Sequence, residues 1–370
     1  MTKVVHLIPG LDKAGAETVL YKLLQFHSNE AISYRVISLG HGDYYNSLIK
    51  ELGYELNIYD IKAHPLRSLL NIIKELRQVD VVCCWMYHAC FLGYCLGKIA
   101  KCKKIVWSIH HSNLNPKYDK RSTLIIAKIC AFISPKVYKI LYSGQTARVN
   151  HEKVGYAADK SDVVINGCDT TVYHPISGAR EKLFGELGIE NDKKIILSVS
   201  RFHPIKDIGL FVQTLGELVR QRKDIVGVMC GRNINRDNVE LINMIENAGV
   251  VLNNNVFLLD VRTDIEVLMS ACDVYVLHSV SEAFPGTLLE AMACGTLAVT
   301  TNAGEAMNMM PDKSCVVPVK DKEALSKKIF SLLDISAITR DKLILRNIDY
   351  VHKKYSVEET VKHYECIFEE

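Results

Sequence analysis

Short runs rich in Val, Ile and Cys alternate with helical stretches along this chain, and no other feature limits its possible folds as strongly. In the first half the apolar runs are Val4 to Ile8, Arg35 to Leu39, Val81 to Trp85, Ile105 to Ile109 and Val137 to Tyr142. Amphipathic stretches lie between them at Ala16 to Phe26, Leu66 to Arg77 and Thr146 to Val154. A strand–helix–strand series of this kind predicts a mostly parallel sheet covered by helices on both faces.

The series stops at two turn signals, Asn166-Gly167 and His174-Pro175, and then begins again. The second series contains Ile195 to Val199, Ile225 to Cys230, Val256 to Leu259, Val274 to Leu277, Leu297 to Thr300 and Cys315 to Val317. Because 370 residues exceed the usual size of a single core, two domains are expected. We predict two Rossmann-like, doubly wound α/β domains, residues 1–169 and 170–350, with a helix in 351–370 returning to the first.

Composition excludes several classes of protein. With 48% hydrophobic and 24% charged residues the chain is an ordinary globular protein. Its 12 cysteines are scattered and form no C-x-x-C pair, which favours a reducing compartment. The apolar N-terminal stretch is too short for a signal peptide, and the uncharged run between Asp80 and Lys98 is too short for a membrane span. A cytoplasmic location is therefore expected.

The loop after the run ending at Leu277 carries the most chemical information. Ligands of open α/β sheets bind beyond the carboxyl ends of the strands, so we expect the site in such loops, facing each other across a cleft. Here Glu282 precedes a helix that Pro285 opens and Gly295 closes. The start of this helix should offer free amides at Gly286, Thr287 and Leu288 to an anion or a hydroxyl.

A second loop supplies cations. Arg201 and Lys206 flank a turn broken by Pro204, so both can converge on one diphosphate. A departing nucleoside diphosphate needs fixed positive charge when no metal supplies it. The alternative is that both are solvated charges, with Lys206 beside Asp207.

The string from His278 to Gly295 closely resembles the E-x7-E segment of retaining GT-B glycosyltransferases, similar to glycosyltransferase family 4. The resemblance implies that Glu282 lies near the donor sugar and its diphosphate, and that Glu290 accepts the ribose hydroxyls. The further donor contacts that it implies are Phe284, Pro285, Gly286, Thr287, Leu288, Gly231 and Val261. A capped surface helix with solvated glutamates is the alternative for this segment.

The first half resembles the same family at two further places. The turn Ala14-Gly15-Ala16 is similar to the family's Gly-Gly-Ala turn, with Ala14 in place of the first Gly, and implies an acceptor or phosphate loop. His110 follows the run ending at Ile109 and matches a family His that reaches the reacting sugar through its backbone carbonyl or ring; the adjacent His111 is the alternative match. The resemblance thus makes Glu282, His110, Arg201 and Lys206 the expected catalytic residues; a structural hydrogen bond is the alternative for His110.

The resemblance implies a retaining hexosyltransferase that uses a nucleotide-diphosphate sugar, with UDP favoured over GDP and ADP. A glycan or polyprenyl-diphosphate-linked acceptor in bacterial surface polysaccharide or O-antigen synthesis is expected. No D-x-D pair and no zinc-like Cys/His spacing occurs, so no metal is expected. No other cofactor and no nucleic-acid partner are expected either. A sugar-nucleotide epimerase of the same fold and a noncatalytic sugar-nucleotide-binding partner subunit are the two alternatives.

The charge is unevenly distributed. Residues 1–165 hold 22 Lys and Arg against 13 Asp and Glu, and residues 98–139 alone hold ten of these cations and one acid. This segment also contains the apolar stretch 124–133, so cations flank a hydrophobic helix as in interfacial anchors. We therefore expect peripheral binding of residues 98–139 to the anionic inner face of the cytoplasmic membrane; a core helix with solvated flanks is the alternative.

Overall fold

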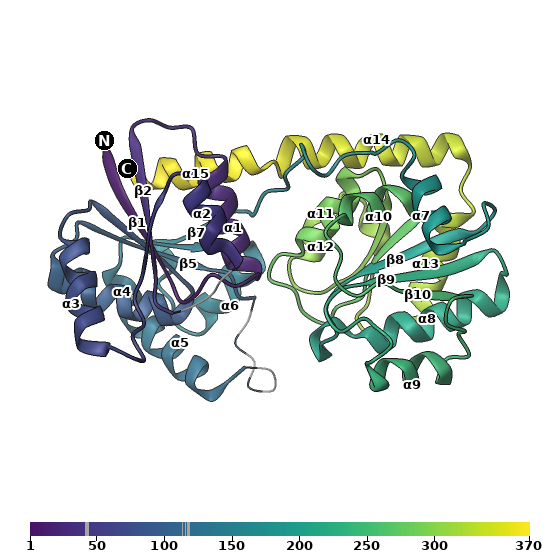
Figure 1. Ribbon diagram of the computed structural model, residues 1–370, viewed down its shortest axis with the longest axis horizontal. Coiled ribbons are helices and arrows are strands. Elements are labelled where there is room, and N and C mark those ends of the chain that lie inside the picture. Colours follow the sequence, from purple (N-terminus) through teal and green to yellow (C-terminus); the bar gives the residue numbers. More distant parts are fainter. Residues whose placement is uncertain (41–43, 113, 115, 117–118) are drawn as a thin grey trace. The chain divides into compact units, whose positions relative to one another are not determined.

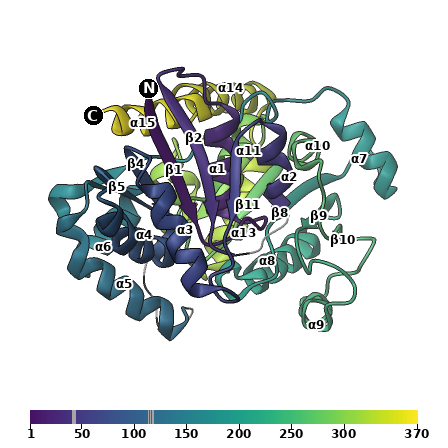
Figure 2. The same cartoon turned by 60° about the vertical axis from the view of Figure 1, so that its left-hand side comes forward.

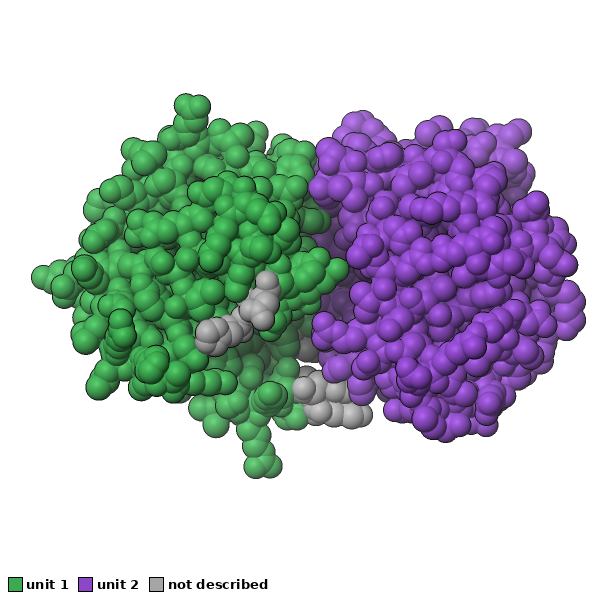
Figure 3. All heavy atoms as spheres, in the orientation of Figure 1, with its two compact units in different colours: residues 1–167, 357–370 green, residues 168–356 purple. Residues whose placement is uncertain are grey.

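The computed structural model describes residues 1–40, 44–112, 114, 116 and 119–370, which form two compact units (Figure 3). Unit 1 comprises Met1–Gly167 and Val357–Glu370, and unit 2 comprises Cys168–Ser356. Each unit contains one parallel sheet with helices on both faces, so the predicted pair of Rossmann-like α/β domains is confirmed (Figure 1).

In unit 1, seven strands of the described residues pair in parallel in the order β3-β2-β1-β4-β5-β6-β7. They are β1 (Thr2–Ile8), β2 (Ile32–Ser38), β3 (Glu55–Ile58), β4 (Val81–Trp85), β5 (Lys104–Ile109), β6 (Lys139–Tyr142) and β7 (Ser161–Val163). Successive side chains of one strand enter opposite cores, since Val4 packs in one apolar cluster and Val5 in the other.

Different helices cover the two faces of this sheet (Figure 2). One face is covered by α1 (Gly15–Gln25), α2 (Tyr44–Glu51) and the C-terminal α15 (Val357–Glu369). The other is covered by α3 (Pro65–Leu76), α4 (Met86–Ala100), α5 (Arg121–Ile133) and α6 (Gln145–Lys153). Helix α15 therefore completes a core whose strands were made at the start of the chain.

In unit 2, six strands of the described residues pair in parallel in the order β10-β9-β8-β11-β12-β13. They are β8 (Lys194–Val199), β9 (Ile225–Cys230), β10 (Val256–Leu258), β11 (Val274–Leu277), β12 (Leu297–Thr301) and β13 (Val316–Val317). Its helices are α7 (Ala179–Leu187), α8 (Ile208–Gln221), α9 (Val239–Asn247), α10 (Ile265–Ala271), α11 (Gly286–Ala293), α12 (Ala306–Met309), α13 (Lys322–Leu333) and α14 (Ala337–Lys354). Helix α8 packs with α9 and α13, whereas α11 packs with α10 and α14.

The uncharged run between Asp80 and Lys98 divides into β4, which has the bounds of the predicted run Val81 to Trp85, and α4. Among the described residues, no helix combines the length and the apolar character that a membrane crossing requires.

Candidate active site

The strand order of unit 2 reverses at β8. This strand lies between β9 and β11, because the chain runs from β8 through β9 to β10 on one side and then crosses back to β11 on the other. Beyond the carboxyl ends of two such strands the loops diverge, which makes this the usual ligand site of an open parallel sheet. The loop after β8 carries Arg201 and Lys206, and the loop after β11 carries Glu282. The sheet order thus brings the two predicted donor loops together.

Lys206 and Glu282 form the central contact of these loops. The Lys206 Nζ lies 2.5 Å from the Glu282 Oε1, and the Ser279 hydroxyl donates to the same oxygen at 2.5 Å. Glu282 is only 8% exposed. A partly buried, charge-assisted contact of this kind is stronger than a surface ion pair because less water screens it.

His278, at the end of β11, fastens the Lys206 loop to the sheet. Its Nδ1 lies 2.5 Å from the carbonyl oxygen of Lys206, and its Nε2 lies 2.7 Å from the Ser198 hydroxyl. Burial lowers the pKa of His278 to about 4, so the ring is neutral near pH 7. The backbone amide of Val280 also donates to the Ile205 carbonyl at 2.9 Å.

Two glycines permit close backbone approaches at this edge. Gly304 has a φ of +55°, and a Cβ there would overlap the carbonyl oxygen of Glu282. Gly231, a predicted donor contact, has a φ of +141°, and a Cβ there would overlap the carbonyl oxygen of Ser200. Any residue with a side chain is therefore disfavoured at both positions, by steric overlap and by the backbone conformation. The backbone beside Arg201 and Glu282 is therefore held within narrow limits.

Arg201 is exposed, while the backbone around it is pinned to the end of β9. The amides of Ser200 and Phe202 donate to the carbonyls of Cys230 and Arg232, both at 2.9 Å. His203 lies in the same loop, and its pKa is lowered first by burial and then by the positive charges of Arg201 and Lys206. The loop after β8 is therefore electropositive, as an anion site requires.

The N-terminus of α11 differs in part from the prediction. The amides of Gly286 and Leu288 are not free, because they donate to Phe284 and Pro285 carbonyls, each at 3.0 Å. The cause is a tight first turn in which Pro285 occupies the N-cap, one position before the helix. The Thr287 hydroxyl accepts from the buried Tyr275 hydroxyl at 2.7 Å, which ties α11 to β11.

Glu290 and Val261 complete the predicted donor contacts of unit 2. Glu290 lies one turn into α11 beside the first residue of the helix, where its Oε1 is 3.7 Å from the Cβ position of Gly286. Val261 is exposed beyond the end of β10 and follows Asp260, whose carbonyl accepts the Gly231 amide at 2.7 Å. Glu290 lies in the first part of a helix and Val261 in a loop, and both follow the carboxyl ends of strands of this sheet.

The predicted residues of unit 1 lie at the carboxyl ends of β1 and β5. Ala14 is the N-cap of α1, and a Cβ added at Gly15 would contact no atom of the described residues. The fold of unit 1 therefore does not itself require a small residue at Gly15. His110 stacks on Trp85 with ring centroids 5.1 Å apart and ring planes 11° apart. Burial lowers the pKa of His110 to about 4.

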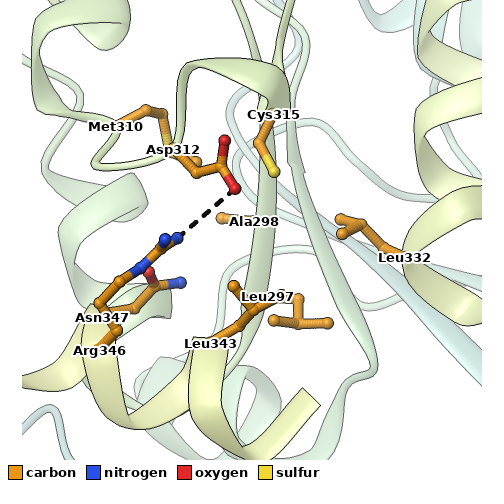
Figure 4. Close-up of a pocket in the computed structure, with 9 residues that line it drawn as sticks. All are labelled: Leu297, Ala298, Met310, Asp312, Cys315, Leu332, Leu343, Arg346 and Asn347. Atoms are coloured by element: carbon orange, nitrogen blue, oxygen red, sulfur yellow. Dashed lines mark ion pairs between the residues drawn. The ribbon is translucent and has the colours of Figure 1, made fainter. Parts of the chain in front are cut away.

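A separate small cavity in unit 2 lies between β12 and α14, away from these loops (Figure 4). Its volume is about 10 Å³, and its rim includes the Arg346–Asp312 ion pair at 3.6 Å. A space of this size holds roughly one water molecule. It is too small for a sugar or a nucleotide.

Comparison with known proteins identifies the class. A family model described as glycosyl transferases group 1 matches residues 179–348, and the model of Glycosyltransferase Family 4 matches residues 13–172. The first match lies in unit 2, whereas the second covers most of unit 1 and ends just inside unit 2. The chain therefore contains a Glycosyltransferase Family 4 domain and a glycosyl transferases group 1 domain.

Individual relatives are distant. A D-inositol 3-phosphate glycosyltransferase of Rhodococcus erythropolis is 26% identical over 43% of this chain and 36% of its own length. The chain thus spans about a third of that relative. EpsF of Bacillus subtilis is 22% identical over 81% of this chain and 79% of its own length.

Solved structures share the GT-B fold across the whole chain. The structure of HepE of Anabaena in complex with UDP has a TM-score of 0.87 at 19% identity, and the match covers 100% of this chain and 100% of that one. A glycosyltransferase of Rickettsia africae has a TM-score of 0.83 at 18% identity, with 100% of this chain and 98% of that one covered. The predicted fold class is thereby confirmed.

Proposed function

We propose that the chain is a retaining glycosyltransferase that moves a hexosyl group from a nucleotide-diphosphate sugar, with UDP favoured, to a glycan or lipid-linked acceptor. The observation that carries this proposal is the Lys206–Glu282 pair, held at 2.5 Å where the strand order of unit 2 reverses. The solved structures of HepE, in complex with UDP, with UDP and glucose, and with UDP-glucose, support the choice of donor.

Lys206 and Arg201 would stabilise the leaving group. When the bond between the anomeric carbon and the phosphate oxygen breaks, its electron pair goes to the nucleoside diphosphate, whose negative charge grows. Fixed cations that face this charge lower the barrier more than mobile ones, because they need no reorganisation. The contact between the His278 ring and the Lys206 carbonyl holds the loop that carries Lys206. A cation held in this way is preorganised to stabilise the leaving group.

Retention follows if the acceptor attacks from the face that the diphosphate leaves. The acceptor oxygen then bonds to the anomeric carbon, and its proton passes to an oxygen of the departing diphosphate. No side-chain nucleophile is consumed in this step. Glu282 would stabilise positive charge on the sugar in the transition state, and the electropositive loop after β8 would take the place of a metal ion at the diphosphate.

The donor is tested by thermal stabilisation. Ligand at about 100 times its dissociation constant adds about 2.7 kcal/mol to the stability of the form that binds it. We expect UDP and UDP-sugars to raise the unfolding temperature of the wild type more than GDP or ADP, and Lys206→Ala to reduce the shift. Stabilisation by no nucleotide would reject the proposed donor site, and release of an epimer without acceptor would indicate an epimerase.

We further propose that unit 1 binds the anionic inner face of the cytoplasmic membrane through α5 and receives a lipid-linked acceptor there, in synthesis of a bacterial surface polysaccharide such as O-antigen. Ile125, Ile129 and Phe132 of α5 are 59%, 40% and 81% exposed, and their spacing puts them on one face of the helix. The exposed cations Arg121 and Lys128 lie on that same face.

Alternating cations and apolar side chains on one exposed helical face fit an anionic lipid surface better than a protein core. Each well-placed cation contributes about 1 kcal/mol near such a membrane. On the same side of the sheet, α3 exposes Leu66 and Leu70, which are also one turn apart. A second helix on this side of the sheet thus also exposes apolar side chains.

A further inference from the structure

His203 lies in the loop between Arg201 and Lys206, and its ring closes the turn that this loop makes. The backbone amide of Ile205 donates to the His203 Nδ1 at 3.2 Å, and the amide of Lys206 donates to the His203 carbonyl at 2.8 Å. His203 thereby caps the short 3₁₀ turn Pro204–Lys206. Its side chain is thus fixed to the backbone that carries Lys206.

The bond at Nδ1 determines where the ring carries its proton. A backbone amide can only donate, so the His203 Nδ1 must offer a lone pair. A neutral imidazole with a lone pair on Nδ1 carries its proton on Nε2, and a doubly protonated ring would place two N–H groups against each other. Burial, and then the positive charges of Arg201 and Lys206, lower the pKa of His203, which agrees with a neutral ring. Neutral His203 is therefore the Nε2–H tautomer.

The Nε2 of His203 is accessible to a ligand. Among the described residues, no group forms a hydrogen bond with this nitrogen, and every buried polar side-chain atom that lacks a partner lies elsewhere. The nitrogen itself is therefore not buried. His203 and Lys206 are partly exposed, and Arg201 is exposed. Because the charges of both cations act on the ring, an anion that reaches Arg201 and Lys206 also comes close to His203.

We propose that His203 donates a hydrogen bond from Nε2 to an oxygen of the donor's diphosphate, beside the charges of Arg201 and Lys206. The proposal rests on the proposed function for its ligand, but the position of the proton is a property of the free protein. A neutral donor contacts a phosphate oxygen without adding a third cation to the loop. Because the amide of Ile205 already fixes the proton on Nε2, the ring needs no reorganisation when the anion binds.

Nitrogen NMR of protein with isotope-labelled histidine tests the tautomer and the contact in turn. In the free wild type we expect His203 to be protonated on Nε2 alone. Inorganic pyrophosphate and UDP should each shift the Nε2 resonance of His203 and leave that of His352, an exposed residue on α14, unchanged. Protonation of Nδ1 in the free protein, or an Nε2 resonance that does not move when these ligands bind, would overturn the proposal.

Two substitutions separate donation to the ligand from support of the turn. His203→Asn keeps an oxygen near the position of Nδ1 that can accept from the Ile205 amide, but it has no donor at the position of Nε2. His203→Gln places an amide donor there instead. By calorimetry, His203→Asn should bind UDP about 10- to 100-fold more weakly, the loss of one hydrogen bond to a charged group, and His203→Gln should regain part of this affinity. His352→Asn is the matched control and should bind like the wild type.

Full affinity of His203→Asn for UDP would show that the ring only supports the turn. A wild type that binds pyrophosphate through His203 but transfers no sugar would refute the proposed function and leave this inference standing. Binding of UDP and pyrophosphate without any change at His203 would refute the inference alone, and binding of neither ligand would refute both. If a variant does not fold, the resonance shift in the wild type carries the test.

Discussion

Lys206 Nζ and Glu282 Oε1 lie 2.5 Å apart although 76 positions separate the two residues in the sequence. The parallel pairing of β8 with β11 brings their loops to the same edge of the sheet. The side chains are 22% and 9% exposed, so both charges are shielded from most of the solvent. A diphosphate that reaches this edge would share Lys206 with Glu282, and its binding therefore changes the electrostatic surroundings of both.

Removal of either cation should slow transfer. Arg201→Ala and Lys206→Ala are each expected to lower kcat by about 10² to 10³, in line with loss of one preorganised charge stabiliser. Steady-state assays with saturating donor measure this effect. Lys342→Ala, an exposed lysine on α14, is the control and should behave like the wild type. Near-normal turnover of Lys206→Ala would show that its pairing with Glu282 is structural only.

Replacing Glu282 and replacing Glu290 should affect different steps of the reaction. Glu290→Ala is expected to weaken nucleotide binding, whereas Glu282→Ala should chiefly slow the chemical step. Calorimetry with the nucleoside diphosphate measures the change in affinity, and single-turnover rates measure the change in the chemical step. Glu282→Gln keeps the shape of the side chain but replaces the carboxylate by a neutral amide, so it tests the negative charge together with the loss of one acceptor oxygen. Equal loss of affinity in both alanine variants contradicts the division of roles.

Activity should not depend on a metal, and the product should keep the anomeric configuration of the donor. EDTA is expected to leave the rate unchanged, because Arg201 and Lys206 are assigned the charge of the leaving group. Product NMR reports the configuration. Recovery of an EDTA-treated enzyme by Mg²⁺ or Mn²⁺ would mean that these two cations do not suffice, and inversion would exclude the proposed mechanism.

Binding to liposomes should need anionic lipid and should weaken as salt rises. Replacing Lys101, Lys103 and Lys104 by Glu, or Phe132 by Glu, is expected to abolish flotation with such vesicles. Ile338→Glu serves as the matched control, because Ile338 is 70% exposed on α14 of unit 2. Equal binding to neutral and anionic vesicles, or none to either, removes the membrane proposal and leaves a soluble acceptor.

Unit 1 should lose more stability on acidification than unit 2, in which His278 is buried and neutral in the same way. Burial lowers the pKa of His6 to about 3 and those of His110 and His151 to about 4, whereas an unfolded His titrates near 6.5. Between pH 6.5 and 4 the unfolded state therefore binds more protons, and the free energy of unfolding falls as the pH falls. The slope is at most about 1.4 kcal/mol per pH unit for each ring.

Both tryptophans, Trp85 and Trp107, are buried in unit 1, so their fluorescence reports that unit alone. Its melting temperature should drop between pH 7 and 5, and replacing the exposed His64 by Asn should not alter the drop. A melting temperature that stays constant over this range would contradict buried neutral rings.

The central strands could be predicted from the sequence because a strand that is buried on both faces is an unbroken run of apolar residues. Strands β4, β9 and β11 have the predicted bounds, and all three are buried throughout. Strands β3 and β7 were not predicted. They are short edge strands, Glu55–Ile58 and Ser161–Val163, whose polar residues and partial exposure give no run of apolar side chains.

At the site, residue types were easier to predict than contacts. Lys206 and Glu282 each belonged to a predicted donor loop, but their pairing depends on the strand order, which a single sequence does not reveal. His278 and Gly304 were missed as supports of the loops. A polar His directly after a buried strand was the available signal for the first, whereas the close approach of Gly304 to Glu282 depends on tertiary structure alone. The predicted free amides of Gly286 and Leu288 were wrong because the first turn of α11 uses them.

Because α15 packs in the core of unit 1, the two units cannot complete their folding in the order in which they are synthesised. Val361, Ile367 and Phe368 pack against the cluster that contains Val4 and Ile8, so the core of unit 1 stays incomplete until residues 357–370 have been synthesised. Unit 2 is one continuous segment and has no such requirement. The domain made second can therefore reach its native core first, while the nascent first domain still exposes the apolar surface that α15 will cover.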